Sequence, residues 1–562
     1  MIYFTSSFIA AGILTFFTRA SPAFIWLAYL LWLSIVLGIF NFVNFVLIFF
    51  RRKKNYELKL VGQSPNLRVA AFITSYNEDP EIVKGTIRSV IAAVDGRGDV
   101  YLLDDSTDPD KKLYEFCREN NVRYIHRTKR RGYKAGAIND ALKEIEDKYD
   151  LVAIFDADQR PTEDFFDVVL PQFKDERVGF VQIPQNYTEL RTRISMGSKY
   201  QQEPFIKVIM EGRDRVSAFS LGSGTVFRIS ALKRAGYLYE KSITEDAATS
   251  VKIHELGYTS KYIDRQLIWY GEPPAYASSY FTQQSRWSLG TFQMLRELLS
   301  SNLSFGAFYD YISGWFYWME TGPLTLVQLL GPIMFLALRV PIIEINPILY
   351  LLFYFPYVLF SFSSYIAIMR RQEYGLKGFL YHQFIEYLEV MPVTASFFAW
   401  IMRRKVPFKV TPKGRIAGSA RVLVFHLTFL ALLCISIVLG INWVLSPAPI
   451  IIKEAVAVNV AWAIYHAFFM AGGAYIALNS REFEHNPYTH SVRAQTNVKS
   501  KLGILRKGCG TLFWHVHLSK LNRLCHRPVQ NRALSILSSR LCAIPHPSIF
   551  LSAAKPASEL LL

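Results

Sequence analysis

The longest apolar segment, AFIWLAYLLWLSIVLGIFNFVNFVLIFF at residues 23–50, constrains this chain more than any other feature. A helix of about 20 apolar residues spans the roughly 30 Å hydrocarbon core of a bilayer, and this segment exceeds that length. Half of the whole chain is hydrophobic (51%), which an ordinary soluble protein does not require. Further segments of this kind occupy residues 315–338, 347–369, 422–445 and 456–478. We therefore predict a multi-span membrane protein.

A shorter apolar segment, IYFTSSFIAAGILTFF, occupies residues 2–17. A signal peptide would need a positive stretch before it and a cleavage site of small residues after it, and neither is present. We interpret it as the first span of a transmembrane hairpin over residues 1–54.

The basic residues orient the spans, because Lys and Arg near span ends favour the cytoplasmic side. They gather after the spans that end near residues 50 and 369 and before the span that begins near 422. This pattern places residues 51–312, the segment 370–421 and the C-terminal tail in the cytoplasm, in an inner or plasma membrane. Topology and anionic lipid then account for the net charge of +18, and no nucleic-acid partner is predicted.

Residues 67–270 predict a soluble α/β domain, because short apolar runs alternate with amphipathic helical stretches. Such alternation is typical of a mostly parallel sheet covered on both faces. The expected strands are residues 68–74, 99–104, 122–127, 150–155 and 178–183, and the expected helices are 80–94, 108–121 and 134–148.

The remaining chain divides by composition. Residues 271–312 predict amphipathic helices at the membrane surface, and 313–369 and 422–478 predict two pairs of spans. Within the cytoplasmic segment 370–421, residues 377–404 are apolar but contain Glu386 and Glu389. Because carboxylates are costly at a bilayer centre, we favour an interfacial or re-entrant helix there. The basic tail 479–562 predicts a disordered or membrane-surface segment.

Polar clusters follow three of the predicted strands: SYNED at 75–79, DDSTD at 104–108 and DADQ at 156–159. Each alone is compatible with a simple turn. Ligands of open α/β sheets bind beyond the carboxyl ends of the strands, and hard carboxylate oxygens suit Mg²⁺ or Mn²⁺ together with substrate phosphates. The clusters therefore favour a nucleoside diphosphate held with a divalent ion, without the P-loop motif of phosphoryl-transfer enzymes.

Three later motifs are ambiguous alone. TED at 244–246 is compatible with a helix start that Thr244 caps, or with a general base at Asp246. QQSRW at 283–287 is compatible with an amphipathic helix turn. It also offers Trp287 as a sugar platform and Arg286 as a permanent cation for developing diphosphate charge. FKVTPKG at 408–414 is compatible with a basic loop.

Six motifs follow one another along the chain: YNE (76–78), DDS (104–106), KAGAIN (134–139), DAD, TED and QQSRW. In these motifs and in their order, the chain resembles the processive family 2 glycosyltransferases. With FKVTPKG as an FxVTxK gating loop, the chain is most similar to the catalytic subunit of bacterial cellulose synthase. The resemblance covers roughly residues 20–480. It implies a GT-A type α/β domain inserted in a multi-span α-helical membrane domain.

The resemblance also implies roles for individual residues. The donor would be bound by Tyr76, Glu78, Asp104, Asp105 and Lys134, with Asp156 and Asp158 holding the metal and diphosphate. The catalytic pair would be Glu245 and Asp246, with Asp246 as the base. The acceptor site at the channel mouth would contain Gln283, Arg286 and Trp287. The gating loop would contribute Phe408, Val410, Thr411 and Lys413.

From this resemblance we expect an inverting enzyme that extends a β-glucan from UDP-glucose and moves it across the membrane. The implied partners are a UDP-sugar, a growing polysaccharide, membrane lipid and accessory synthase subunits. One departure leaves other products open, because FSLGSGTVFR (219–228) has Leu221 where cellulose synthases have cysteine. The alternatives are a synthase of another polymer, such as hyaluronan or a mixed-linkage glucan, a lipid-linked sugar transferase, and a non-catalytic sugar-nucleotide sensor. The tail also lacks an RxxxR signature, so regulation by a cyclic-di-GMP-binding PilZ domain is not predicted.

Overall fold

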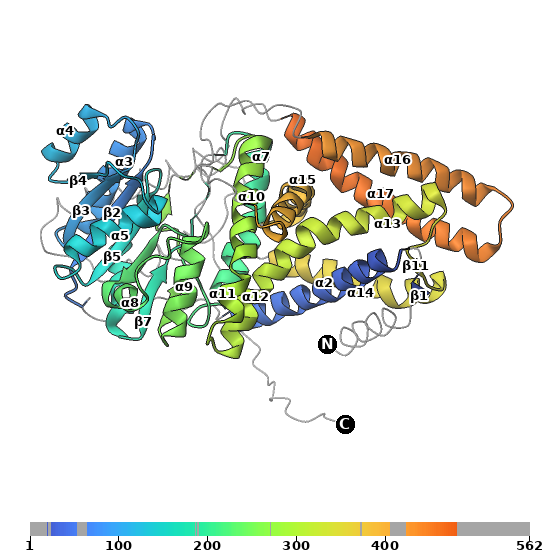
Figure 1. The fold of residues 1–562 in the computed structure, drawn as a ribbon, viewed down its shortest axis with the longest axis horizontal. Helices are drawn as coiled ribbons and strands as arrows, with labels where there is room; N and C mark the ends of the chain where they lie inside the picture. The colour runs from blue at the N-terminus through green and yellow to red at the C-terminus, as the bar shows by residue number, and fades with distance from the viewer. Residues whose placement is uncertain are drawn as a thin grey trace, which may run out of the picture. The chain divides into compact units, whose positions relative to one another are not determined.

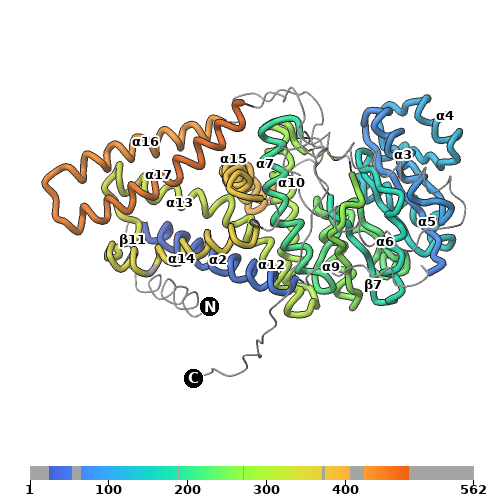
Figure 2. Tube along the Cα trace, turned by 180° about the vertical axis from the view of Figure 1, so that it is seen from behind, coloured from blue at the N-terminus to red at the C-terminus, as the bar shows by residue number. Residues whose placement is uncertain are grey.

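The structure is a computed structural model that combines an α/β domain with a bundle of long helices (Figures 1 and 2). It describes residues 19–20, 24–52, 65–185, 187, 190–269, 271, 273–370, 374–404 and 423–479. Three predicted segments lie outside the described residues: the first span at 2–17, the FKVTPKG segment at 408–414 and the tail beyond residue 479.

The α/β domain is built on a seven-stranded sheet with strand order β4-β3-β2-β5-β8-β7-β9. Strand β2 lies near the centre and pairs in parallel with β3 and β5, while β8 runs antiparallel between β5 and β7. Parallel strands covered on both faces are continuous apolar runs, as in VAAFITS of β2. The strands are β2 (Val69–Ser75), β3 (Gly98–Asp104), β4 (Arg123–His126), β5 (Leu151–Asp156), β7 (Val178–Gln182), β8 (Thr225–Arg228) and β9 (Thr259–Tyr262).

Helices cover both faces of this sheet, and two apolar cores lie between helices and strands. The predicted helix at 80–94 is α3 (Pro80–Val94), with Asp79 as its N-cap. The one predicted at 108–121 is shorter, because Asp110 caps α4 (Lys111–Glu119) by accepting from Lys112 and Leu113 N–H groups. The other elements are α5 (Tyr133–Ile145), β6 (Arg160–Pro161), α6 (Phe165–Val169), η2 (Leu170–Lys174), α8 (Ile229–Arg234), α9 (Glu245–Glu255) and β10 (Ile268–Trp269). These features confirm the predicted α/β class.

The helical bundle contains, among the described residues, six helical segments long and apolar enough to cross a membrane. Its elements are β1 (Arg19–Ala20), α2 (Ile25–Arg51), α7 (Arg193–Pro204), η3 (Phe205–Met210), α10 (Ala277–Gln293), α11 (Leu295–Leu299), α12 (Phe305–Met319), the π-helical turn η4 (Glu320–Leu324), α13 (Thr325–Leu338), β11 (Ile343–Glu344), α14 (Pro347–Arg370), α15 (Gly375–Ile401), α16 (Val424–Leu445) and α17 (Ile450–Leu478).

Helix α15 differs in direction from its neighbours. Both figures show it nearly end-on, whereas α2, α13, α16 and α17 lie along the page. It packs against α7, α10 and α17. Helix α15 is itself one of the six helices long and apolar enough to span a bilayer, and length and composition do not distinguish a span from a helix in the membrane plane. An interfacial position for residues 377–404 therefore remains our prediction.

Candidate active site

The polar clusters predicted at the strand ends share one edge of the sheet. Ser75, the last residue of β2, is in register with Asp104 of β3, and Thr74 is in register with Asp156 of β5. The SYNED, DDSTD and DADQ clusters therefore begin side by side, although up to about eighty residues separate them in sequence.

Asp104 and Asp105 are both buried and strongly bonded. One oxygen of Asp104 accepts from the N–H (3.0 Å) and hydroxyl of Ser106, and the other accepts from the Tyr124 hydroxyl at 2.6 Å. Asp105 accepts two bonds from the Arg127 guanidinium, at 2.9 and 2.6 Å. In this structure both carboxylates fix the edge of the site, and their predicted contact with a nucleoside stays a prediction.

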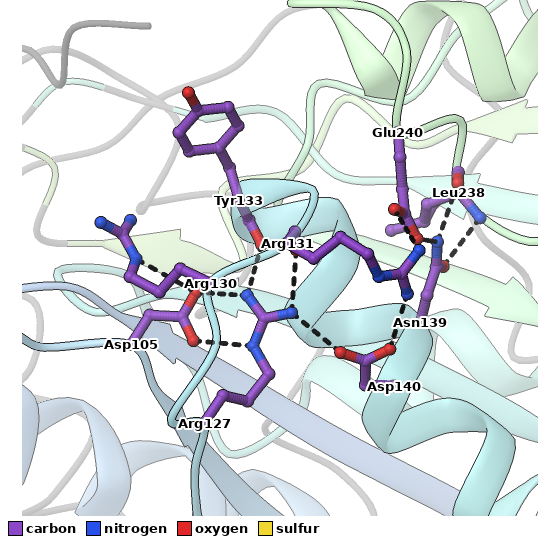
Figure 3. Close-up of polar contacts among 9 residues, drawn as sticks. All are labelled: Asp105, Arg127, Arg130, Arg131, Tyr133, Asn139, Asp140, Leu238 and Glu240. Carbon is purple, nitrogen blue, oxygen red and sulfur yellow. Dashed lines mark hydrogen bonds and ion pairs between the residues drawn. The ribbon is translucent and has the colours of Figure 1, made fainter.

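A basic loop, residues 127–133, lies over this edge and is anchored by acidic residues (Figure 3). The two oxygens of Asp140 accept hydrogen bonds from Arg127 and Arg131, each at 2.9 Å. Arg131 also donates to Glu240 at 2.8 Å. Asn139 donates to the other oxygen of Glu240 at 2.9 Å. These ion pairs fix the position of the loop, and they keep its arginine side chains beside the edge of the sheet where the polar clusters lie.

The same loop brings Arg130 over one of the predicted donor residues. The Arg130 guanidinium carbon lies 3.7 Å from the centre of the Tyr76 ring, so the positive charge of Arg130 is attracted to the face of that ring. Glu78 follows two residues later and is half-buried. The region around Tyr76 therefore offers a flat surface and positive charge, which suit a nucleotide.

Lys134 joins two sides of the site. Its ammonium group donates to Asp156 Oδ1 at 2.5 Å and to the Gly222 carbonyl at 2.8 Å. Asp156 is partly exposed, whereas Asp158, two residues later, is buried. The cation thus connects the end of β5 to the loop at residues 219–224.

The TED motif lies directly beside that loop. Glu245 and Asp246 begin α9, and a Cβ on Gly222 would be 3.1 Å from Asp246 Oδ2. Gly222 has a positive φ of 82°, so a side chain there would be both strained and crowded. Burial, followed by repulsion from Asp246, raises the pKa of Glu245, and burial raises the pKa of Asp246. A carboxylate with a raised pKa is a stronger base, as proton abstraction requires.

The QxxRW motif lies on α10, next to the TED motif. Gln283 is buried and donates to the Tyr187 hydroxyl at 3.3 Å, while Arg286 and Trp287 are partly exposed. Burial raises the pKa of Tyr187 to about 12, and the nearby charges of Asp158 and Arg286 act on it in opposite directions. The structure thus brings the DAD and QxxRW motifs together.

Two glutamines that the sequence analysis did not single out hold the 219–224 loop. Gln182 is completely buried; its amide nitrogen lies 2.9 Å from the Ser223 carbonyl, and its oxygen accepts from Leu221 N–H at 2.8 Å. Gln185 donates to the Leu221 carbonyl at 2.9 Å. The available signal was FVQIPQ, in which polar amides end an apolar strand beside the site.

Asp156 and Asp158 fit a divalent ion that also binds substrate phosphates. Among the described residues, no group of three or more His, Cys, Asp or Glu side chains is close enough to hold a metal alone. Mg²⁺ usually takes one or two protein carboxylates plus phosphate oxygens and water, and this pair meets that requirement. The four predicted gating-loop residues, Phe408, Val410, Thr411 and Lys413, lie outside the described residues.

Close packing of α10 on α9 gives a testable constraint. A Cβ on Gly290 would lie 2.5 Å from Thr244 Cγ2, so Gly290→Ala should separate the QxxRW helix from the TED motif. For the sugar transfer that the resemblance implies, we expect a fall of about tenfold or more, since such displacements are costly near reacting groups. Gly314→Ala is the matched control, because a Cβ there meets nothing within 4 Å. Equal activity of the two variants, measured as UDP release, would contradict this packing constraint.

Comparisons with known proteins agree with this geometry. Residues 65–290 match the family model described as glycosyltransferase like family 2. The chain is 28% identical to a cellulose synthase catalytic subunit (UDP-forming) of Pseudomonas fluorescens over 78% of this chain and 59% of that protein. It is 32% identical to the corresponding subunit of Xanthomonas axonopodis pv. citri over 41% of this chain and 32% of that protein.

Among solved structures, a mannosyltransferase from Pyrobaculum calidifontis in complex with GDP-Man and Mn²⁺ matches 67% of this chain and 100% of its own, at 16% identity and a TM-score of 0.45. The chain spans about 59% or less of the length of the first curated relatives that it matches. The ordered motifs and the sheet that assembles them agree with the family match: residues 65–290 are similar to the glycosyltransferase like family 2 domain, in a chain similar to the catalytic subunits of bacterial cellulose synthases.

Proposed function

We propose that this protein is a membrane-embedded, processive, inverting β-glycosyltransferase that extends a β-glucan from UDP-glucose and translocates it. The observation that supports this most directly is the link from Asp156 through Lys134 to Gly222, which lies against Asp246. Groups suited to hold a diphosphate and a group suited to take a proton thereby meet at one sheet edge. Six apolar helical segments among the described residues, and the similarity to cellulose synthase catalytic subunits, support membrane embedding and processivity.

On the donor side, Tyr76, Glu78, Asp104 and Asp105 surround the position proposed for the uridine. Lys134, whose ammonium group contacts Asp156 and the Gly222 carbonyl, would face the diphosphate. Asp156 and Asp158 would hold Mg²⁺ or Mn²⁺, and such an ion supplies positive charge to the departing diphosphate.

On the acceptor side, Asp246 takes the proton of the attacking sugar hydroxyl. The hydroxyl oxygen forms a bond to the anomeric carbon, and the bond from that carbon to UDP breaks, with its electron pair leaving on UDP. One displacement from an α-linked donor yields a β-linkage. Glu245 shares the site beside the base, and burial together with the Asp246 charge raises its pKa. Trp287 offers a flat face for the acceptor ring, Gln283 a polar edge, and Arg286 positive charge.

The remaining assignments rest on the resemblance. Phe408, Val410, Thr411 and Lys413 would close over the bound donor, and the polymer would leave through the helical bundle. The catalytic domain would face the cytoplasm from an inner or plasma membrane, with lipid and accessory subunits as partners. Leu221 is the observation that keeps a second product in view, because it replaces the cysteine of cellulose synthases beside the acceptor.

The function is tested by incubating the purified protein in lipid vesicles with radiolabelled UDP-glucose, UDP-N-acetylglucosamine, UDP-glucuronate or UDP-galactose. We expect UDP release and a long β-linked product from UDP-glucose with Mg²⁺ or Mn²⁺, and at least about a hundredfold loss of both with EDTA. Digestion with linkage-specific glycosidases identifies the product. A long product from another sugar would indicate a different polymer, and a short lipid-extractable product would indicate a lipid-linked sugar transferase. No UDP release from any donor would contradict the proposal and favour a sensor.

A further inference from the structure

A buried carboxylate, Glu389 in the middle of α15, lies where four helices meet, and its side chain has no exposed surface. Its oxygens accept hydrogen bonds from Gln201 of α7 at 2.9 Å, from the Tyr280 hydroxyl of α10 at 2.9 Å and from the Tyr317 hydroxyl of α12 at 3.3 Å. We call these four residues the Glu389 clamp. A carboxylate inside an apolar bundle is costly unless its oxygens are bonded, so three donors from three different helices indicate a specific purpose.

The clamp contacts α10, the helix that bears the QxxRW motif, through Tyr280. Tyr280 lies one turn before Gln283 on α10. A second contact lies on the other side of Gln283, where the Ser396 hydroxyl of α15 donates to the Ser285 carbonyl at 3.1 Å. Helix α15 thus holds α10 at two points on either side of Gln283.

We propose that Glu389 is a positioning residue that, through Tyr280, sets where Gln283, Arg286 and Trp287 lie relative to Asp246. This inference rests on the proposed function, because it assigns the acceptor to that face of α10. The helix that bears Glu389 ends at Ile401, a few residues before Phe408 in the sequence.

The geometry predicts which kinetic step depends on the clamp. An acceptor hydroxyl must be within hydrogen-bond reach of Asp246, and a misplacement of about 1 Å can cost about a hundredfold in rate. The groups proposed to bind the donor lie on the strand ends and on the 127–134 segment, not on α10. Loss of the clamp should therefore lower turnover while leaving donor affinity unchanged.

Two substitutions test this, each with a matched control in the same bundle. Tyr280→Phe removes one clamp hydroxyl, and Tyr365→Phe removes a partly buried hydroxyl that contacts His382 at 2.9 Å. Glu389→Gln removes the clamp charge, and Glu320→Gln removes another carboxylate of the bundle, which accepts from Ser34 at 2.9 Å and from Gln328 at 2.8 Å.

For Tyr280→Phe and Glu389→Gln we expect kcat for UDP release to fall by about tenfold or more, with KM for the donor within about twofold and a shorter product. The two controls should stay within about twofold of the unmodified protein in kcat and KM. Equal effects in clamp and control variants, or a raised donor KM with unchanged kcat, would overturn the proposal. Tyr280→Phe is the milder change and keeps the test open if Glu389→Gln does not fold.

A second measurement does not depend on sugar transfer. Backbone amides of residues 277–293 should exchange with deuterium faster in Tyr280→Phe and Glu389→Gln than in Tyr365→Phe and Glu320→Gln, because only the first pair releases α10. Equal exchange in all four variants would overturn the clamp. Absence of activity in the unmodified protein would contradict the proposed function and leave this measurement valid.

Discussion

Asp246→Asn is expected to abolish polymer synthesis while leaving UDP binding intact. The amide has nearly the same size as the carboxylate but cannot take the proton of the acceptor hydroxyl, and a positioned general base contributes about a hundredfold to ten-thousandfold to a rate. The groups proposed to hold the nucleotide, such as Lys134 and Asp156, keep their mutual contact at 2.5 Å. The measurements are UDP release from the labelled donor and UDP affinity by calorimetry.

The control for this substitution is Glu255→Gln, which removes one carboxylate from the other end of α9. Gln keeps an oxygen that can accept from Asn302 N–H, as Glu255 does at 3.0 Å. We expect Glu255→Gln to retain full activity. Synthesis by Asp246→Asn at a tenth or more of the normal rate would be incompatible with Asp246 as the base.

The raised pKa values of Glu245 and Asp246 predict two further results, one for the pH dependence of activity and one for the pH dependence of stability. Burial raises both carboxyl pKa values, so activity should fall on acidification at a higher pH than for an ordinary exposed carboxylate. The folded state binds these protons more tightly than the unfolded state, so the pair lowers stability as pH rises from the ordinary carboxyl range through the raised pKa values. Asp246→Asn removes one of the two buried carboxylates and so part of this loss of stability. Its midpoint of thermal unfolding at neutral pH should be no lower than that of the unmodified protein.

Local patterns predicted most elements of the α/β domain, because apolar runs and caps determine strands and helices over short distances. Pro80 and Asp79 locate the start of α3, and the strand over 150–155 is β5 with a shift of one residue. The antiparallel strand β8 was not predicted. Its four residues, TVFR, form a strand because β5 and β7 flank them, which no short-range pattern reveals.

The candidate site was predictable where chemistry concentrates in one short motif. The edge shared by Asp104 and Asp156 follows from parallel pairing of their strands with β2. Contacts between distant segments were not predictable. Glu389 was noted only as a charge that is costly in a bilayer, and its three donors lie about seventy to almost two hundred residues away in sequence. Side-chain burial and helix crossing decide such contacts, and a linear pattern encodes neither.

A buried charge cluster at the end of α2 is a second contact of this kind. Asp310 of α12 is fully buried and accepts two bonds from Arg51, at 3.0 and 2.5 Å, and one from the Ser217 hydroxyl at 2.5 Å. Arg213, also buried, donates to the Asp310 carbonyl and to Ser313. The Asp310 carboxylate thus pairs with Arg51 and its carbonyl accepts from Arg213, so this one residue joins α2, α12 and the 211–217 segment.

Among single substitutions of buried residues in this region, Asp310→Ala is therefore expected to lower the free energy of unfolding the most. Removing one partner of a buried ion pair typically costs about 3–5 kcal/mol, because the remaining charge stays buried without compensation. Here Arg51, whose side chain is 33% exposed, would lose both of its bonds to Asp310, and the buried Arg213 would lose the negative charge of Asp310. The measurement is the midpoint of thermal unfolding in detergent micelles.

The matched control is Asp167→Ala, which breaks an ion pair with Arg97 at 2.7 Å whose Asp167 side chain is 51% exposed. Exposed pairs contribute about 1 kcal/mol or less, so this midpoint should barely move. Asp310→Asn should lie between the two, because the amide keeps an acceptor for Ser217 while losing the charge that pairs with Arg51. If Asp310→Ala melts together with Asp167→Ala, the two guanidinium groups find water or other partners, and the cluster does not hold α2 to α12.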